Sequence, residues 1–336
     1  MAATVVCSSS NVEVVCESGP VTSETRTPVC VLGAGLIGGS LLRAAVAAGY
    51  EVWGYNRSAA GALAARADGF DVIDDLPAVL KRAADTDALI VVAVPMPAVD
   101  HLLADIAAFA PHCALTDVVS VKAPVAELVR RHGLAGRYVG GHPMAGTSES
   151  GWSATDSTLF RGAVWAVGVD RGTHPDPWTR VVRLALDCGS AVVPVVAADH
   201  DRAVARISHL PHVLAEALAV VGAAGGELSL GLAAGSFRDG TRVAATAPDL
   251  VRAICEPNAT ALLEVLDETL TVLGTARDSL RANGTLGQLI DAGHDGRADY
   301  ETVRRWEITD IEAGDHDWLE RLHDAGLRGG IITRLP

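Results

Sequence analysis

Apolar and polar positions divide the chain into two parts with different periodicity. Up to about residue 196, apolar runs of strand length alternate with alanine-rich segments of helical length. The strand-like runs are VCVLG, EVWGYN, DALIVVAVP, CALTDVV and RYVGGH, followed by AVWAVGV and SAVVPVV on either side of the helical stretch WTRVVRLALDC. This alternation predicts βαβ units and a parallel sheet covered by helices.

After Ala197 the apolar positions recur at helical spacing over long segments. These are ADHDRAVARISHLPHVLAEALAVVGAAG and PNATALLEVLDETLTVLGTARDSL, which carry Ala, Leu and Val on more than one face. Helices of this composition bury against a partner, and a second copy of the chain is the simplest partner. The second part is therefore predicted to be an all-α dimerisation domain.

A glycine pattern follows the first predicted strand and opens a helix. In GAGLIGGS, Gly33 permits a tight turn, Gly35 lets the backbone approach a pyrophosphate, and Gly38 lets the helix pack on the strand. Leu36 and Ile37 open the helix, whose free N–H groups and positive dipole end suit phosphate. The pattern predicts a Rossmann-like α/β domain that binds a dinucleotide.

The nicotinamide cofactor is predicted from the end of the second strand. This position carries Asn56, Arg57 and Ser58 where NAD sites commonly have a carboxylate. An arginine without a neighbouring carboxylate favours the 2′-phosphate of NADP over NAD. Stacking of Arg57 on the adenine, which would permit NAD, is the alternative. Val94 and Pro95, after the DALIVV strand, complete the predicted cofactor set.

The two patterns divide the 336 residues into four predicted segments. Residues 1–27 are a polar leader without lasting period. Residues 28–196 form the dinucleotide-binding domain and residues 197–282 the helical substrate and dimerisation domain. Residues 283–336 form a C-terminal extension to which the sequence assigns no role.

Charge and composition narrow the class of partner. A formal net charge of −14 disfavours a nucleic-acid surface, and an anionic substrate would need specific arginines to hold it. No uninterrupted apolar run reaches bilayer length and the N-terminus lacks a signal-peptide pattern, so we expect a cytoplasmic protein without a membrane partner. Six scattered cysteines without a C-x-x-C pair suggest neither a disulfide framework nor a metal site.

Two polar residues follow strands of the predicted sheet. In GGHPMAGTSESGW, His142 comes directly after a strand and is held by a proline and two glycines, as a general base requires. A histidine that only caps this turn is the alternative. Ser120, in TDVVSVKAPV, stands between a strand and a helix at the edge where such sheets bind ligands, and it is either a site residue or a helix N-cap.

Two further segments supply polar groups from the helical part. In ARISHLPHVLAEAL, Pro211 should kink the helix, and Ser208 and His212 share a face from which His209 points away. We expect Ser208 and His212 to meet a ligand, with burial in the core or an interface as the alternative.

In AAGSFRDGTRV, Gly235 opens a short loop before Arg242. An arginine in such apolar surroundings needs an anionic partner, which is either a substrate carboxylate or Asp239.

Taken together, GAGLIGGS, DVVSVKAPV, GGHPMAGT, SHLPH and SFRDGTR resemble the prephenate and arogenate dehydrogenase family in order and spacing, from about Val29 to Leu280. The resemblance implies oxidative decarboxylation of a cyclohexadienol dicarboxylate with hydride transfer to NAD(P)⁺ in tyrosine biosynthesis. It implies that His142 accepts the ring-hydroxyl proton with Ser120 as partner, that His212 lies near substrate and nicotinamide, and that Arg242 binds a substrate carboxylate.

The chain departs from the family pattern at Ser148, where many members have Glu, and near Val251, where many have Trp. These departures leave substrate specificity and feedback inhibition open. A relative acting on arogenate or 4-amino-4-deoxyprephenate would keep the same motifs. A catalytically silent NAD(P)-binding protein would be free to lose His142 and Arg242, and both are retained. β-Hydroxyacid dehydrogenases and imine reductases are disfavoured because SHLPH stands where they usually place a lysine or other catalytic group.

Overall fold

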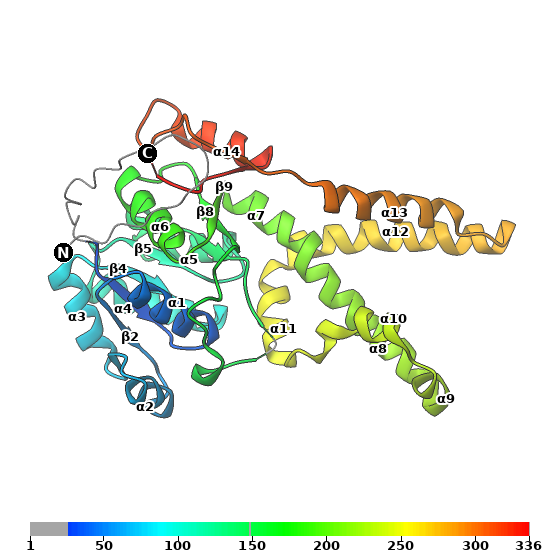
Figure 1. The fold of residues 1–336 in the computed structure, drawn as a ribbon, viewed down its shortest axis with the longest axis horizontal. Helices are drawn as coiled ribbons and strands as arrows, with labels where there is room; N and C mark the ends of the chain where they lie inside the picture. The colour runs from blue at the N-terminus through cyan, green and yellow to red at the C-terminus, as the bar shows by residue number, and fades with distance from the viewer. Residues whose placement is uncertain (1–25, 148, 336) are drawn as a thin grey trace, which may run out of the picture.

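A computed structural model of the chain describes residues 26–147 and 149–335. Most of the predicted leader and Ser148 lie outside these residues. The described chain forms an α/β part and a helical part that extends away from it as two arms (Figure 1).

The α/β part is built on a parallel sheet of six strands in the order β3-β2-β1-β4-β5-β6. The strands are β1 (Val29–Leu32), β2 (Val52–Tyr55), β3 (Val72–Ile73), β4 (Leu89–Val92), β5 (Leu115–Asp117) and β6 (Tyr138–Val139). The connecting helices are α1 (Leu36–Ala47), α2 (Ala59–Ala67), α3 (Leu76–Thr86), α4 (Val99–Phe109) and α5 (Ala123–Arg131). This doubly wound order is that of dinucleotide-binding folds and confirms the predicted Rossmann-like domain.

A second sheet of three strands completes the α/β part. It has the order β7-β8-β9, with β7 (Gly141–Pro143), β8 (Val164–Gly168) and β9 (Ala191–Val195), and α6 (Pro175–Asp187) connects the last two. The interpretation of RYVGGH as one strand was wrong, because it supplies β6 to the first sheet and β7 to the second. His142 therefore lies within a strand, opposite Ala166, rather than after one.

Glycine explains this change of sheet. A Cβ atom at Gly141 would lie 2.6 Å from the carbonyl oxygen of Asp117, which is closer than real Cβ contacts. Only a residue without a side chain lets the chain pass the end of β5 at this distance. The glycine pair before His142 therefore carries the backbone from one sheet to the other.

The helical part begins directly after β9. Its first helix runs for 28 residues, Ala197–Ala224, as α7 (Ala197–Val204), a π-helical turn (Ala205–His209) and α8 (Leu210–Ala224). The remaining helices are α9 (Gly226–Gly231), α10 (Gly235–Gly240), α11 (Pro248–Cys255), α12 (Ala259–Asn283) and α13 (Gly287–Thr302). The irregularity expected at Pro211 is this π turn, in which the N–H of Leu210 bonds the oxygen of Ala205.

Apolar side chains on the two arms are exposed in a single copy. Val221 and Leu228 are 71% and 75% exposed, and Leu263 on α12 is 59% exposed. Faces of this kind fit the predicted burial against a second copy. The 28-residue helix is long and apolar enough to cross a membrane. It contains no uninterrupted apolar run of that length, because polar residues interrupt it. One such helix is weak evidence for a membrane span.

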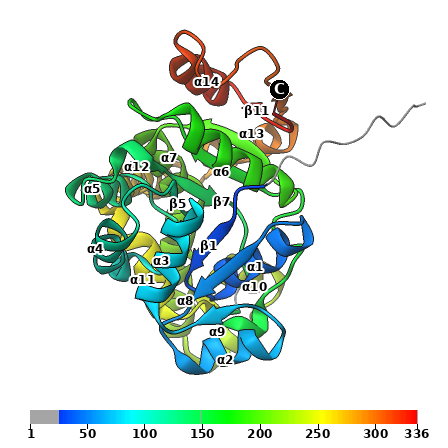
Figure 2. The same cartoon turned by 90° about the vertical axis from the view of Figure 1, so that its left-hand side faces the viewer.

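The last described residues return to the α/β part. They form β10 (Trp306–Glu307), α14 (Trp318–Leu327) and β11 (Gly330–Ile331). Of these, α14 and β11 contact β9, and α14 lies above α6 in Figure 2. Ile332 and Val192 exchange backbone hydrogen bonds of 2.8 and 2.9 Å, and the Trp318 ring packs edge-on against Trp178 at 5.2 Å between centroids. The C-terminal segment therefore covers the edge of the three-stranded sheet.

We predict that Trp318→Ala lowers the free energy of unfolding by about 3 kcal/mol, because the buried indole leaves a cavity beside Trp178. Urea denaturation followed by circular dichroism measures this change. Val303→Ala, at a position 66% exposed, serves as the control and should change stability by less than about 0.5 kcal/mol. Equal effects of the two substitutions would contradict the packing described for this segment.

Candidate functional site

A cavity of about 540 Å³ opens at the carboxyl ends of β1, β2 and β4. Six of the predicted cofactor residues line it: Gly33, Gly35, Asn56, Arg57, Val94 and Pro95. Sequence reasoning missed Tyr55, His101 and Asp105, which also line this cavity. Tyr55 ends β2, and the other two stand on one face of α4, so their helical spacing was the available signal.

The glycine loop has the geometry that a dinucleotide requires. Gly33 has φ of +113°, and a Cβ atom there would lie 2.4 Å from the oxygen of Ala93. At Gly38 a Cβ atom would lie 1.9 Å from the oxygen of Gly33, so the helix packs closely on the loop. Apart from its chain neighbours and the backbone of its own helix, no described residue has an atom within 4 Å of the Cβ position of Gly35, which leaves room for a phosphate at the start of α1. These residues fit a bound dinucleotide.

The remaining cofactor candidates lie beside this loop. Leu36 and Ile37 begin α1, and the hydroxyl of Ser58 accepts the N–H of Gly61 at 3.3 Å as the N-cap of α2. The side chain of Arg57 is exposed at the rim of the cavity. A guanidinium in this position is free to meet either a 2′-phosphate or an adenine.

His142 forms a chain with two residues that the sequence did not single out. Its Nδ1 lies 2.9 Å from Nε2 of His200, and Nδ1 of His200 lies 2.8 Å from Oδ1 of Asp201. Both partners are buried and stand on α7, which packs against α5 where the helical part begins. The ADHD sequence at this junction was the available signal, because it places adjacent His and Asp at the start of a helix.

Asp201 also binds the start of α5. Its two oxygens accept the N–H groups of Lys122 and Ala123, each at 2.8 Å. Burial alone would raise the pKa of Asp201, but the hydrogen bonds from His200 and these N–H groups outweigh burial and lower it. The carboxylate is therefore ionised at neutral pH.

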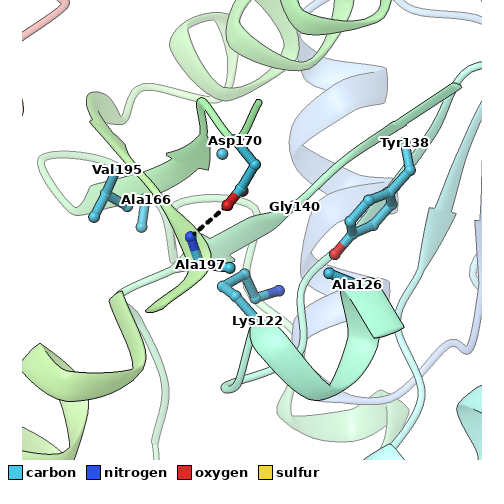
Figure 3. A pocket seen from close by; sticks show the side chains of 9 residues that line it. Lys122, Ala126, Tyr138, Gly140, Ala166, Asp170, Val195 and Ala197 are labelled. Atoms are coloured by element: carbon cyan, nitrogen blue, oxygen red, sulfur yellow. Dashed lines mark hydrogen bonds between the residues drawn. The ribbon is translucent and has the colours of Figure 1, made fainter. Parts of the chain in front are cut away.

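A buried lysine lies beneath His142. The ammonium group of Lys122 is paired with Asp117 and donates to the oxygen of Gly141 at 2.6 Å, and the Tyr138 hydroxyl donates to Asp117 at 2.6 Å. Lys122, Tyr138 and Asp170 line a small cavity in which Asp170 accepts the N–H of Ala197 (Figure 3). The sequence motif DVVSVKAPV contained Lys122, but only its serine was selected.

These surroundings keep the His142 imidazole neutral. Burial lowers the pKa of His142 well below its usual value, and His200, the Lys122 ammonium and His209 lower it further. At pH 7 a nitrogen of this ring is therefore available to accept a proton. Across residues 26–147 and 149–335, no group of three or more His, Cys, Asp or Glu side chains has an arrangement suited to a metal ion.

The helical part adds a second buried histidine. The amide of Asn258 donates to the oxygen of Asp201 at 2.8 Å and lies 3.1 Å from Nδ1 of His209. Nε2 of His209 is buried without a partner among the described residues, and burial lowers the pKa of this ring to about 4. The π turn thus buries His209, the histidine of SHLPH that the sequence interpretation set aside.

His212 belongs to a different group of charges. It is half-buried near Glu216 and Arg242, and burial, opposed by Glu216, lowers its pKa. Arg242 is exposed and forms no ion pair with Asp239 or with another carboxylate in the described part of the chain. Of the two partners considered for Arg242, the structural pair with Asp239 is absent from the described residues.

The other predicted site residues lie around these two groups. Ser120 is half-buried between β5 and α5, two residues before the lysine that binds the backbone next to His142. Ser208 is half-buried in the π turn, and Gly235 begins α10. The described contacts join His142 to α7 and α5, and they join His212 to the segment that contains Arg242.

Two family models match this chain. The model for "Prephenate dehydrogenase, nucleotide-binding domain" matches residues 40–194, and the model for "Prephenate dehydrogenase, dimerization domain" matches residues 196–290. The boundary between the two models coincides with the end of β9, where the α/β part gives way to helices.

Comparisons with individual proteins point to the same family as the two family models. The chain is 32% identical to the cyclohexadienyl dehydrogenase of Zymomonas mobilis over 75% of its own length and 88% of that protein. It is 32% identical to the prephenate dehydrogenase of Lactococcus lactis over 64% of its length, but the match spans only 60% of that relative. A crystal structure of a provisionally named prephenate dehydrogenase from Corynebacterium glutamicum is 50% identical, with a TM-score of 0.87 over 91% of this chain and 98% of that one.

The glycine loop over an open dinucleotide cavity, the half-buried histidine at the edge of the second sheet and the apolar helical part all agree with these matches. The chain belongs to the prephenate dehydrogenase family of NAD(P)-dependent oxidoreductases, with a Rossmann-like nucleotide-binding domain and a helical dimerisation domain.

Proposed function

We propose that this protein oxidatively decarboxylates prephenate to 4-hydroxyphenylpyruvate in tyrosine biosynthesis, with hydride transfer to NAD(P)⁺. The observation that carries the proposal is the neutral, half-buried imidazole of His142, held by His200 at the sheet edge of a nucleotide-binding domain. Family membership supports the same reaction. A bound oxidised nicotinamide supplies the hydride acceptor, and the glycine loop from Gly33 to Gly38 with the N-terminus of α1 would hold its pyrophosphate.

His142 is the general base in this proposal. The hydride can leave the carbinol carbon only as the hydroxyl on that carbon becomes a carbonyl, so a base must take the hydroxyl proton. The ring carboxylate then leaves as carbon dioxide, and its bonding electrons make the ring aromatic. The proton held by His142 returns to the phenolic oxygen, which restores the neutral imidazole. Ser120 is proposed to bond the same hydroxyl.

The anionic ends of the substrate require cations on the helical side. Arg242 supports this role because its guanidinium is exposed, lies near His212 and has no carboxylate partner among the described residues. We propose that Arg242 binds a carboxylate of the substrate, while His212, Ser208 and the loop at Gly235 line the same side. A net charge of −14 would otherwise repel a dicarboxylate, so a specific guanidinium matters for binding.

The protein is proposed to act in the cytoplasm as a homodimer and to favour NADP over NAD. The exposed apolar arms support the dimer, and the match of the helical part to a dimerisation domain supports it independently. Arg57 at the cavity rim, after a β2 strand that ends without a carboxylate, supports NADP.

The direct test uses purified protein with prephenate, arogenate or 4-amino-4-deoxyprephenate and each cofactor, followed by the absorbance of the reduced nicotinamide. Turnover of prephenate with release of carbon dioxide is expected. Turnover only with an amino-bearing substrate would move the proposal to arogenate or the amino-deoxy analogue. Cofactor binding without turnover of any of the three would indicate a catalytically silent protein.

We predict that His142→Asn lowers kcat by roughly 10² to 10⁴ while leaving cofactor affinity and most substrate affinity in place, since removal of a general base affects the chemical step. Steady-state kinetics and cofactor titration by fluorescence measure the two effects. His112→Asn, an exposed histidine remote from the site, is the matched control. Near-normal turnover by the His142 variant would refute this role.

Arg242→Ala should raise KM for prephenate at least about tenfold with a smaller change in kcat, because it removes the charged contact to a substrate carboxylate. Arg130→Ala removes the same charge from an exposed position on α5 and should leave KM unchanged. An unchanged KM in the Arg242 variant would exclude it as the carboxylate ligand.

Arg57→Ala should raise KM for NADP by about tenfold and leave KM for NAD within about threefold, since only NADP carries the 2′-phosphate that the guanidinium would pair with. Comparison of the two cofactors in the same assay measures the difference. Equal increases for both cofactors would instead indicate that Arg57 stacks on the adenine ring.

A further inference from the structure

The series of hydrogen bonds from His142 through His200 to Asp201 determines which ring nitrogens carry protons. Asp201 is ionised and accepts from two backbone N–H groups, so its oxygen facing His200 can only accept a hydrogen bond. Nδ1 of His200 must therefore carry a proton. In a neutral His200 ring, Nε2 then has a lone pair, and it faces Nδ1 of His142 at 2.9 Å.

The tautomer of His142 follows from its contact with His200. Its Nδ1 donates to the lone pair of His200, so in the neutral ring the proton of His142 lies on Nδ1 and the lone pair on Nε2. The rings meet at 69° with centroids 5.1 Å apart, as expected for nitrogens joined edge to edge. One carboxylate thus sets the tautomers of two imidazoles in series.

We propose that His200 and Asp201 are positioning residues that select the Nδ1–H tautomer of His142 and thereby leave Nε2 as the atom that takes the substrate proton. This inference rests on the proposed function of His142 as the base and adds the atoms that set its state. When Nε2 gains the substrate proton, the imidazolium of His142 keeps its Nδ1–H bond to His200. The positive charge is then separated from the Asp201 carboxylate by one imidazole ring.

The surroundings of His200 support this arrangement. The charged and titratable groups around it are His142 on β7, Lys122 at the start of α5, Asp201 on α7 and His209 in the π turn. The Lys122 ammonium is paired with Asp117, which leaves Asp201 as the anion that contacts the histidine chain. His200 is 3% exposed, so water does not compete for its hydrogen bonds.

Two amide substitutions at position 200 distinguish the two hydrogen bonds of the His200 ring, because each keeps one of them and removes the other. In His200→Gln, the amide group can reach the position of Nε2 and its oxygen can accept the Nδ1–H of His142. In His200→Asn, the shorter side chain places the amide near the position of Nδ1, where it donates to Asp201 and leaves His142 without its acceptor. Both variants bury one amide, so they form a matched pair for folding.

We expect His200→Asn to lower kcat by about tenfold to a hundredfold with little change in KM, because removing an orienting partner acts on the chemical step. His200→Gln should stay within about threefold of the unmodified enzyme. Thermal denaturation and cofactor titration of both variants identify any loss of folding. If the two folded variants are equally active or equally impaired, the inference is overturned, whereas activity retained by His142→Asn would overturn the proposed function itself.

A direct measurement on the unmodified protein does not depend on the position-200 variants. Nitrogen-15 spectra of histidine-labelled protein distinguish the two tautomers of a neutral ring, and the spectrum of His142→Asn assigns the resonances of His142. The inference requires the proton of His142 on Nδ1. A proton found on Nε2 at neutral pH would overturn it even if the position-200 variants do not fold.

Discussion

The buried carboxylate of Asp201 is the interaction on which the arrangement of the site depends. A desolvated charge must be fully hydrogen-bonded, and this one is satisfied by two backbone N–H groups of α5 and by His200. The helix α5 belongs to the nucleotide-binding domain, and α7 begins the helical part. The Asp201 carboxylate therefore joins the two domains at their junction. The backbone carbonyl oxygen of Asp201 also accepts from the Asn258 amide, which extends the network to the start of α12.

Steric limits at a few glycines place the sheet edge that carries His142 next to this junction. Gly141 lets the chain leave the six-stranded sheet within contact of Asp117, and the strand that follows presents His142 toward α7. Lys122 binds both Asp117 and the oxygen of Gly141, so the end of β5 and the start of β7 are held by one ammonium group. Removal of water from this region strengthens each of these interactions and raises the cost of breaking any of them.

The helical part differs from the α/β part because many of its apolar side chains are exposed in a single copy. Its long helices bury few side chains in a single copy, and large apolar side chains such as Val220 and Leu232 are exposed. In the proposed homodimer, burial of these side chains against a second copy would provide further hydrophobic stabilisation. The C-terminal segment instead returns to the α/β part, where Trp318 packs on α6 and Ile332 extends the smaller sheet. The helical arms are thus tied to the nucleotide-binding domain at both ends.

The sequence by itself determined the alternation of strands and helices in the first part, the position of the dinucleotide loop and the family, because periodicity and the steric needs of glycine are local properties. It also identified His142 and Arg242 as chemically distinctive residues. Only the tertiary structure decided that RYVGGH supplies strands to two sheets and that a π turn precedes Pro211. It also decided that His142 is hydrogen-bonded to His200. That last contact joins residues 58 positions apart, and it exists only because the helical part packs on the sheet. In the sequence, His200 and Asp201 are two polar residues at a helix start, and their role depends on a burial that no local pattern encodes.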